Sequence, residues 1–93
     1  MTTKYEKGAY FERRVRDWLR AKGYIVWRTP GSKSPCDLIA NAGGEWSLWQ
    51  CQTNPYFEPK KVAALAMLCF EVECVGYLAW RDNKQKIQFK EVG

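Results

Sequence analysis

The stretch GYIVWRTPGSKSPCDLIANAGGEWSLWQCQ, residues 23–52, alternates short runs of β-branched and aromatic residues with turn-forming residues. Such runs predict strands, here at 24–29, 36–41 and 46–52. The prolines, glycine and serines of residues 30–35 predict a loop after the first strand, and Ala-Gly-Gly-Glu at 42–45 predicts a hairpin turn before the third. The stretch therefore predicts three neighbouring strands of a β-sheet.

A helix is predicted immediately before this stretch, over residues 5–22. Its apolar side chains recur at helical spacing and form one face, made by Phe11, Val15, Trp18 and Leu19. Gly23 is expected to end the helix, because glycine readily takes the left-handed conformation that follows a last helical turn. One helix face is therefore available to cover the sheet.

The second half of the chain adds another helix and two strands to the prediction. A loop leads to a helix at 60–71, and strands are expected at 74–81 and 86–92 with a turn between them. The resulting order is α-β-β-β-α-β-β. It predicts an α/β fold with a single domain over residues 1–93, in which a central mixed five-stranded sheet is flanked by two helices.

The predicted helix 60–71 is apolar on two sides. One stripe consists of Val62, Leu65, Ala66 and Cys69, and a second, nearly opposite stripe consists of Ala63, Met67 and Phe70. A helix that is apolar on both sides has two surfaces to bury. The sheet of so short a chain can cover only one of them. The other is a candidate contact between two copies of the chain, and we expect a homodimer through helix 60–71.

The positive charge of the chain is concentrated in its first third. Residues 1–35 contain nine lysines and arginines and three acidic residues, a net charge of +6, whereas residues 36–93 contain six basic and seven acidic residues, a net charge of −1. This asymmetry is typical of a surface that binds a polyanion such as a nucleic acid. A well-solvated basic surface without a ligand is the alternative interpretation of the charge alone.

The chain has no histidine and has four cysteines, at positions 36, 51, 69 and 74. The missing histidine excludes Ser-His-Asp and Cys-His catalysis. No two cysteines form a Cys-X-X-Cys pair, so a structural zinc site is not expected, and their apolar neighbours predict reduced, mostly buried thiols. No apolar run is long enough to cross a bilayer, and the first residues lack the apolar region of a signal peptide. We therefore expect a cytoplasmic protein with no membrane partner.

Four polar side chains near the predicted sheet are candidates for chemistry. Glu12 lies beside the apolar arc of its helix, where a carboxylate usually has a partner or a chemical role. Asp37 stands at the head of its strand, and Gln50 and Gln52 share one face of theirs because side chains alternate along a strand. Two structural interpretations stay open: Asp37 as a turn residue that begins a strand, and the glutamines as the polar end of a half-exposed strand.

Three segments, KGAYFERRV at 7–15, GYIVWRTPGSKSPCDLIA at 23–40 and LWQCQ at 48–52, form a recognisable series. In order and spacing the series resembles the archaeal and phage Holliday junction resolvases of the PD-(D/E)XK nuclease superfamily. The family pattern places a glutamate after a Lys-Gly pair and an aspartate after an arginine and a Gly-Ser-Lys loop. It then has Glu or Gln, any residue, and Lys on one strand. The resemblance covers nearly the whole chain.

The resemblance implies a metal-dependent endonuclease of DNA recombination and repair that cleaves branched DNA at four-way junctions. It implies catalytic roles for Glu12, Asp37, Gln50 and Gln52. It also implies that Mg²⁺ or Mn²⁺ is held by Glu12, Asp37, Gln50 and the main-chain carbonyl of Cys51. The positions expected to contact DNA phosphates are Lys7, Arg13, Arg14, Arg28, Ser32 and Lys33.

Two positions depart from the usual family residues. Gln50 replaces the more usual Glu, a change that also occurs in the superfamily, and Gln52 stands where the catalytic lysine is usual. A neutral amide donates hydrogen bonds but brings no positive charge, so Gln52→Lys is expected to raise cleavage. Lys33 and Lys60 are candidates for a cation supplied from elsewhere. Three interpretations follow: an active junction endonuclease, a catalytically weakened or inactive junction-binding module on the same fold, and an unrelated basic α/β adaptor.

Overall fold

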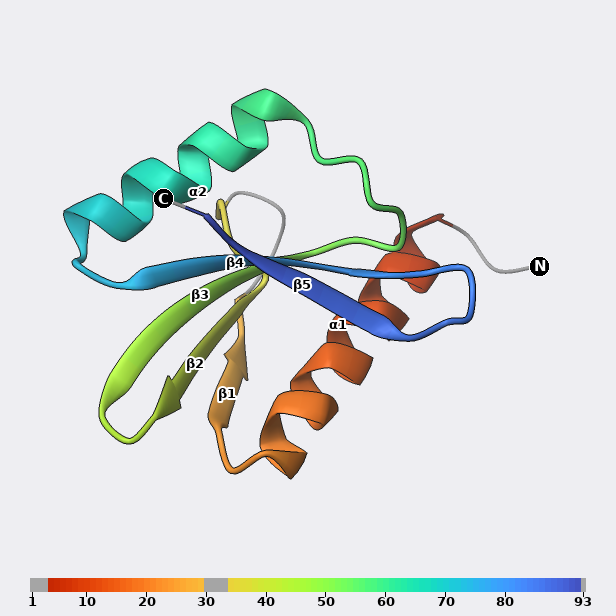
Figure 1. Cartoon of the computed structure of the whole chain (residues 1–93), viewed down its shortest axis with the longest axis horizontal. Helices are drawn as coiled ribbons and strands as arrows, with labels where there is room; N and C mark the ends of the chain where they lie inside the picture. The colour runs from red at the N-terminus through yellow and green to blue at the C-terminus, as the bar shows by residue number, and fades with distance from the viewer. Residues whose placement is uncertain (1–3, 30–33, 93) are drawn as a thin grey trace.

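The computed structural model describes residues 4–29 and 34–92 and has the predicted order of elements (Figure 1). The helices and strands are α1 (Lys4–Ala21), β1 (Ile25–Arg28), β2 (Leu38–Ala42), β3 (Glu45–Cys51), α2 (Pro59–Glu71), β4 (Val75–Arg81) and β5 (Ile87–Val92). Each boundary lies within two residues of its predicted position. Asp37, predicted at the head of a strand, lies directly before β2.

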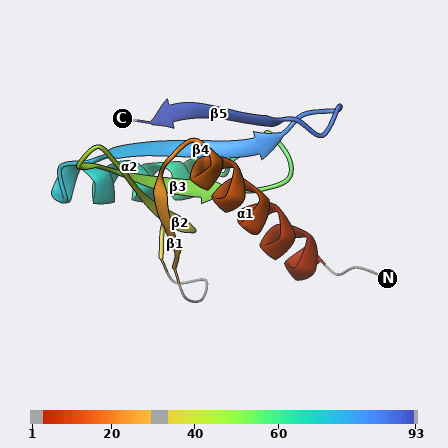
Figure 2. The same cartoon turned by 90° about the horizontal axis from the view of Figure 1, so that it is seen from below.

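The strands form one five-stranded sheet in the order β1-β2-β3-β4-β5. β3 and β4 run parallel, and the other neighbouring pairs are antiparallel, so the prediction of a mixed sheet is confirmed. A parallel pair requires a crossover connection, which α2 provides. β1 and β5 form the two edges of the sheet, and Figure 2 shows β5 beside β4.

The helices lie on opposite sides of the sheet (Figure 1). On the α1 side, Phe11, Val15 and Leu19 are buried against side chains of the first four strands: Val26, Leu38, Ala40, Trp49, Cys51 and Ala79. The helix ends at Ala21, and Gly23 lies in the turn that terminates it, as predicted. Gly23 has a φ of 95°, and the Tyr24 N–H donates to the carbonyl oxygen of Leu19 over 3.2 Å. This turn directs the chain from α1 into β1.

On the other side of the sheet, α2 packs through Leu65 and Cys69, which are buried against Cys36, Leu48 and Leu78. A Cβ atom at Gly76 in β4 would lie 2.6 Å from the Cys69 sulfur. No real Cβ contact is that short, so the glycine permits α2 to lie this close to the sheet. All four cysteines are free and three of them are buried, which confirms the predicted state of the thiols.

The second apolar stripe of α2 faces solvent. Met67 is 66% exposed and Phe70 is 85% exposed, so the sheet covers only one side of this helix, as predicted. Neither helix is long and apolar enough to span a membrane, within the part of the chain that the structure describes. The exposed stripe leaves one surface of α2 available for another contact.

Candidate active site

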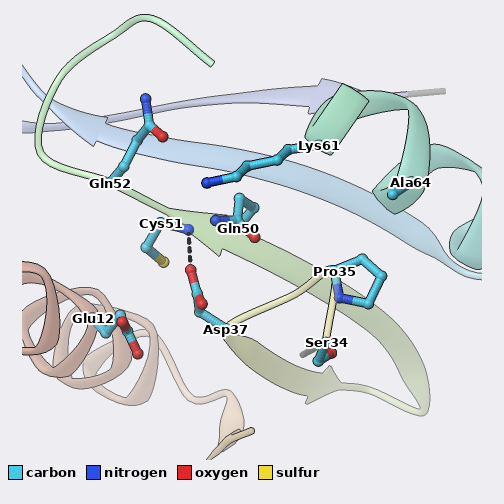
Figure 3. Close-up of a pocket in the computed structure, with 9 residues that line it drawn as sticks. All are labelled: Glu12, Ser34, Pro35, Asp37, Gln50, Cys51, Gln52, Lys61 and Ala64. Atoms are coloured by element: carbon cyan, nitrogen blue, oxygen red, sulfur yellow. Dashed lines mark hydrogen bonds between the residues drawn. The ribbon is translucent and has the colours of Figure 1, made fainter. Parts of the chain in front are cut away.

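A pocket of about 430 Å³ opens where the end of β3 meets α1, the start of β2 and the first turn of α2. It is lined by Glu12, Ser34, Pro35, Asp37, Gln50, Cys51, Gln52, Lys61 and Ala64 (Figure 3). The predicted site residues Glu12, Asp37, Gln50 and Gln52 therefore come together, as their helical and strand positions indicated. Their catalytic roles remain predictions.

Asp37 is held between its two neighbouring strands. Its backbone N–H donates to the Trp49 carbonyl over 2.7 Å, and its own carbonyl accepts from the Thr29 N–H over 3.0 Å. Its side-chain Oδ2 accepts a 2.9 Å hydrogen bond from the backbone N–H of Cys51 (Figure 3). Three hydrogen bonds thus fix Asp37, two at its backbone and one at its carboxylate, although the residue lies outside β2.

The environment of Asp37 raises the pKa of its carboxyl group above the usual value. Burial is the largest cause, because it disfavours the charged form. The hydrogen bond from Cys51 and the positive charges of Lys61 and Arg28 act in the opposite direction and lower the pKa. The carboxylate is therefore partly desolvated and lies within the field of two cations.

Glu12 approaches the same pocket from α1. Its side chain is 21% exposed, which confirms the prediction that it turns toward the core, and its Oε1 lies 3.5 Å from a guanidinium nitrogen of Arg28. Burial and the nearby negative charge of Asp37 raise the pKa of Glu12, whereas Arg28 and Arg13 lower it. The two carboxylates are close enough to repel each other.

Gln50 and Gln52 both line the pocket, but the amide of Gln52 is engaged with the following loop. Its Nε2 lies 3.1 Å from the Asn54 carbonyl oxygen and 3.0 Å from Asn54 Oδ1, and it also donates to the Tyr56 carbonyl. In Figure 3 the side chain points away from Asp37 toward this loop. The donor that sequence analysis placed at the reaction centre is thus used to hold the chain after β3.

Lys61 is a charged pocket residue that sequence analysis missed. It lies in the first turn of α2, and Figure 3 shows its amine directed toward Gln50 and the end of β3. Of the two sequence-based candidates for a relocated cation, Lys60 is not among the residues that line this pocket, and Lys33 lies outside the described residues. The available signal was helical spacing, because Lys61 precedes the buried Leu65 by one turn.

The basic residues proposed to bind DNA occupy several places. Lys7 and Arg13 line a second pocket with Arg81, a β4 residue that sequence analysis did not propose. Arg14 donates a hydrogen bond to the backbone carbonyl of Gln85 in the β4–β5 turn, and Arg28 pairs with the site glutamate. Ser32 and Lys33 lie outside the residues that the structure describes.

Comparison with known proteins decides the family. Residues 3–92 match the family model of the archaeal Holliday junction resolvases (Hjc). The chain belongs to this family. Over 54 residues it is 43% identical to the crossover junction endodeoxyribonuclease Hjc of Methanocaldococcus jannaschii; the match covers 58% of this chain and 40% of that relative's length. The structure of Archaeoglobus fulgidus Hjc aligns with a TM-score of 0.79 at 22% identity, over 90% of this chain and 76% of that one.

The donor set of the Hjc-type pocket fits a hard divalent cation. Within residues 4–29 and 34–92, no group of three or more His, Cys, Asp or Glu side chains is placed to hold a metal. The pocket instead offers two partly desolvated carboxylates, Glu12 and Asp37, and the amide oxygen of Gln50. Mg²⁺ is commonly held by one or two carboxylates, with waters and substrate phosphates completing its shell. A cation between the carboxylates would relieve their repulsion.

The thiol of Cys51 is unsuited to this donor set. Burial raises the pKa of this thiol well above its usual value, and the negative charges of Asp37 and Glu12 add to the rise. Thiolates, not thiols, bind metals. A contribution of the Cys51 main-chain carbonyl to a metal site remains a prediction.

Proposed function

We propose that this chain is a metal-dependent, structure-selective DNA endonuclease that hydrolyses phosphodiesters at four-way junctions. The observation that carries the proposal is the convergence of Glu12, Asp37 and Gln50 in one pocket of an Hjc-family chain. In the reaction, water adds to phosphorus and one P–O bond to a sugar breaks. One new strand end leaves with a hydroxyl group and the other keeps the phosphate.

Mg²⁺ or Mn²⁺ is the proposed cofactor. Glu12, Asp37, Gln50 and the main-chain carbonyl of Cys51 would hold it, and it would supply charge stabilisation and a more acidic water. The surrounding protein groups act by orienting the two carboxylates. The Cys51 N–H orients Asp37, and the Arg28 guanidinium, 3.5 Å from Glu12 Oε1, restrains Glu12. With only two carboxylates in the set, affinity for the cation is expected to rise when a DNA phosphate adds its own charge.

Branched DNA is the proposed substrate, bound through the basic residues of α1 and β1. Arg13 and Lys7 share a pocket with Arg81 and one acidic residue, Glu6, so a net positive charge continues from α1 onto the end of β4. Contacts of this kind neutralise phosphates and set position without reading sequence. We therefore propose that this surface holds the DNA backbone next to the carboxylate pocket, where Arg28 pairs with Glu12.

A homodimer is proposed because a four-way junction has two-fold symmetry and its paired cuts need two sites. The exposed stripe of α2 that contains Met67 and Phe70 supports this assembly. Large apolar side chains that face solvent on one helix side are common at contacts between subunits. Two copies related by a two-fold axis through α2 would bury this stripe.

A second candidate function is a junction-binding module without nuclease activity. One observation favours it: the amide of Gln52 is hydrogen-bonded to the loop and brings no charge to the pocket. Loss of one preorganised catalytic group typically lowers a rate by about 10²–10³-fold. A binding module would retain the basic surface and the fold.

Incubation with a synthetic four-way junction, with Mg²⁺ or with EDTA, separates the two candidates. The endonuclease is expected to cleave the junction in Mg²⁺, to leave a linear duplex of the same length largely intact, and to be inactive in EDTA. Asp37→Asn is the matched inactive control, because it keeps the size and the acceptor for Cys51 while removing the charge. Junction binding without Mg²⁺-dependent cleavage would support the binding module instead.

A further inference from the structure

One positive charge of the pocket comes from α2. Among the described residues that line it, Lys61 is the only lysine or arginine. The adjacent Lys60 belongs to the same helical turn but does not line the pocket. A helix that docks on a sheet presents successive residues in different directions, so these two neighbours have different environments.

Helix packing explains why Lys61 reaches the site. Leu65 is fully buried under α2 and lies one turn after Lys61 on the same side of the helix. Ala64 also lines the pocket, and its small side chain leaves room beside the lysine stem. The side chain therefore extends from the start of α2 across the end of β3 (Figure 3).

Lys61 also interacts electrostatically with the site carboxylate. Burial raises the pKa of Asp37, and the positive charge of Lys61 is among the effects that lower it. A cation that stabilises the charged carboxylate is close enough to attract a second anion in the same pocket. A phosphodiester in this pocket would be such an anion.

The loop after β3 connects Gln52, at the position where the family pattern has a lysine, to the first turn of α2, which carries Lys61. Gln52 holds the backbone of Asn54 and Tyr56, and the Tyr56 N–H donates to Asn54 Oδ1 over 3.0 Å. A few residues later, Phe57 packs edge-on against Trp80, with ring centroids 6.2 Å apart, just before α2 begins at Pro59. Gln52 thus orders the segment that leads into the turn carrying Lys61.

We propose that Lys61 supplies the positive charge that the family pattern places at position 52, and that its ammonium group contacts a phosphate oxygen of DNA bound in the pocket. This inference rests on the proposed endonuclease function and identifies the cation of that site. In this proposal Lys61 acts through its positive charge and takes no part in bond making or bond breaking. Gln52 is a positioning residue, since it orders the loop before α2 and does not touch the phosphate.

The test compares Lys61→Met with Lys60→Met, a matched pair with the same charge change on the same helical turn. In Mg²⁺, Lys61→Met is expected to lower the single-turnover rate of junction cleavage by about 10²–10³-fold. Lys60→Met should stay within about a factor of two, the range of ordinary surface substitutions. Lys61→Arg, which keeps the charge, should retain more activity than Lys61→Met. Melting temperatures of all variants check that the fold is intact.

A binding measurement in EDTA tests the phosphate contact without catalysis. The slope of log affinity against log salt concentration should fall by about one for Lys61→Met, the loss of one phosphate contact, and stay unchanged for Lys60→Met. Equal slopes for the two variants, or equal cleavage rates where the starting protein cleaves, would overturn the role of Lys61. If the starting protein binds junctions but never cleaves them, the endonuclease proposal fails, and the slope still decides whether Lys61 contacts phosphate.

Discussion

The backbone N–H of Cys51 donates a 2.9 Å hydrogen bond to Oδ2 of Asp37, so the last residue of β3 orients the carboxylate that precedes β2. No hydrogen bond within the described residues involves Asp37 Oδ1. The arrangement fixes the carboxylate with one oxygen and leaves the other toward the pocket. A carboxylate buried in this way destabilises the folded state, and such destabilised residues are typical of functional sites.

Asp37→Asn is expected to stabilise the protein at neutral pH. The pKa of Asp37 is raised above 3.8 in the folded state, chiefly by burial. Its stabilising contribution to the free energy of unfolding is therefore fully present only at pH values below the unfolded pKa. That contribution is lost as the pH rises through the folded pKa, and the charged form then destabilises the fold. Asparagine removes the charge and still accepts from Cys51. Thermal unfolding at pH 7 should show a gain of about 1 kcal/mol, or ~4–8 °C, that disappears below pH 3.8.

Asp82→Asn is the control with the opposite sign. Asp82 is partly exposed, and its pKa is lowered, chiefly by the hydrogen bond from the backbone of Lys86, with Lys84 and Gln88 adding to the effect. A carboxyl group whose pKa is lower in the folded than in the unfolded state stabilises the folded state at pH values above the unfolded pKa. This stability is lost as the pH falls through the folded pKa. Asp82→Asn should therefore lower the melting temperature at pH 7. A fall for Asp37→Asn as well would show that its carboxylate is not strained by burial.

Divalent cations are expected to raise the melting temperature through the carboxylate pocket. A ligand that binds only the folded state stabilises it by about 2.7 kcal/mol at a hundredfold excess over its Kd. Titration with Mg²⁺ or Mn²⁺ should raise the melting temperature of the starting protein, and EDTA should reverse the rise. Asp37→Asn should lose most of the response and Asp82→Asn should keep it. An equal response in both variants would place the cation elsewhere.

Period and spacing alone predicted most of the fold and four pocket residues. The helical repeat of Phe11, Val15 and Leu19 located α1, and strand alternation placed Gln50 and Gln52 on one side of β3. These signals are local, because each depends only on the geometry of one element. Local patterns were therefore sufficient to bring a helix residue and strand residues to the same end of the sheet.

The contacts that change the interpretation of the site are tertiary. Lys61 reaches the pocket only because Leu65 docks α2 on the sheet, and neither residue is part of the family pattern. The hydrogen bonds of Gln52 depend on how the loop after β3 folds back. Sequence spacing does not specify such a loop conformation, so it placed the Gln52 amide at the reaction centre and named Lys60 in place of Lys61.

Phe70→Glu is expected to separate the proposed homodimer into monomers. Phe70 is 85% exposed in the single chain, so the substitution removes no core contact and the melting temperature of the monomer should change little. A charge in an apolar contact between two copies opposes association. Light scattering at micromolar concentration should give a dimer for the starting protein and a monomer for Phe70→Glu. Tyr56→Glu, at a side chain that is 73% exposed in the loop, is the matched control and should remain a dimer. A monomeric starting protein would contradict the dimer.

The remaining prediction concerns a lysine at position 52. From the sequence alone, Gln52→Lys should raise cleavage well above that of the starting protein. The structure favours a smaller gain, because Nε2 of Gln52 is surrounded by three oxygens, from Asn54 and Tyr56. An ammonium group has three donors and matches those acceptors, so the new lysine should be held by the loop. With Lys61 already supplying charge, we expect a gain below about tenfold.

Gln52→Leu isolates the structural part of this argument. It removes the donor and keeps a side chain of similar size, so the loop should loosen and the Tyr56 N–H, which donates to Asn54 Oδ1, should exchange faster with deuterium. Gln52→Lys should keep the slow exchange of the starting protein. A gain in cleavage of about a hundredfold for Gln52→Lys, together with fast exchange at Tyr56, would mean that the ammonium leaves the loop and joins the phosphate. In that case position 52 would be where the site needs its cation, and Lys61 alone would be insufficient.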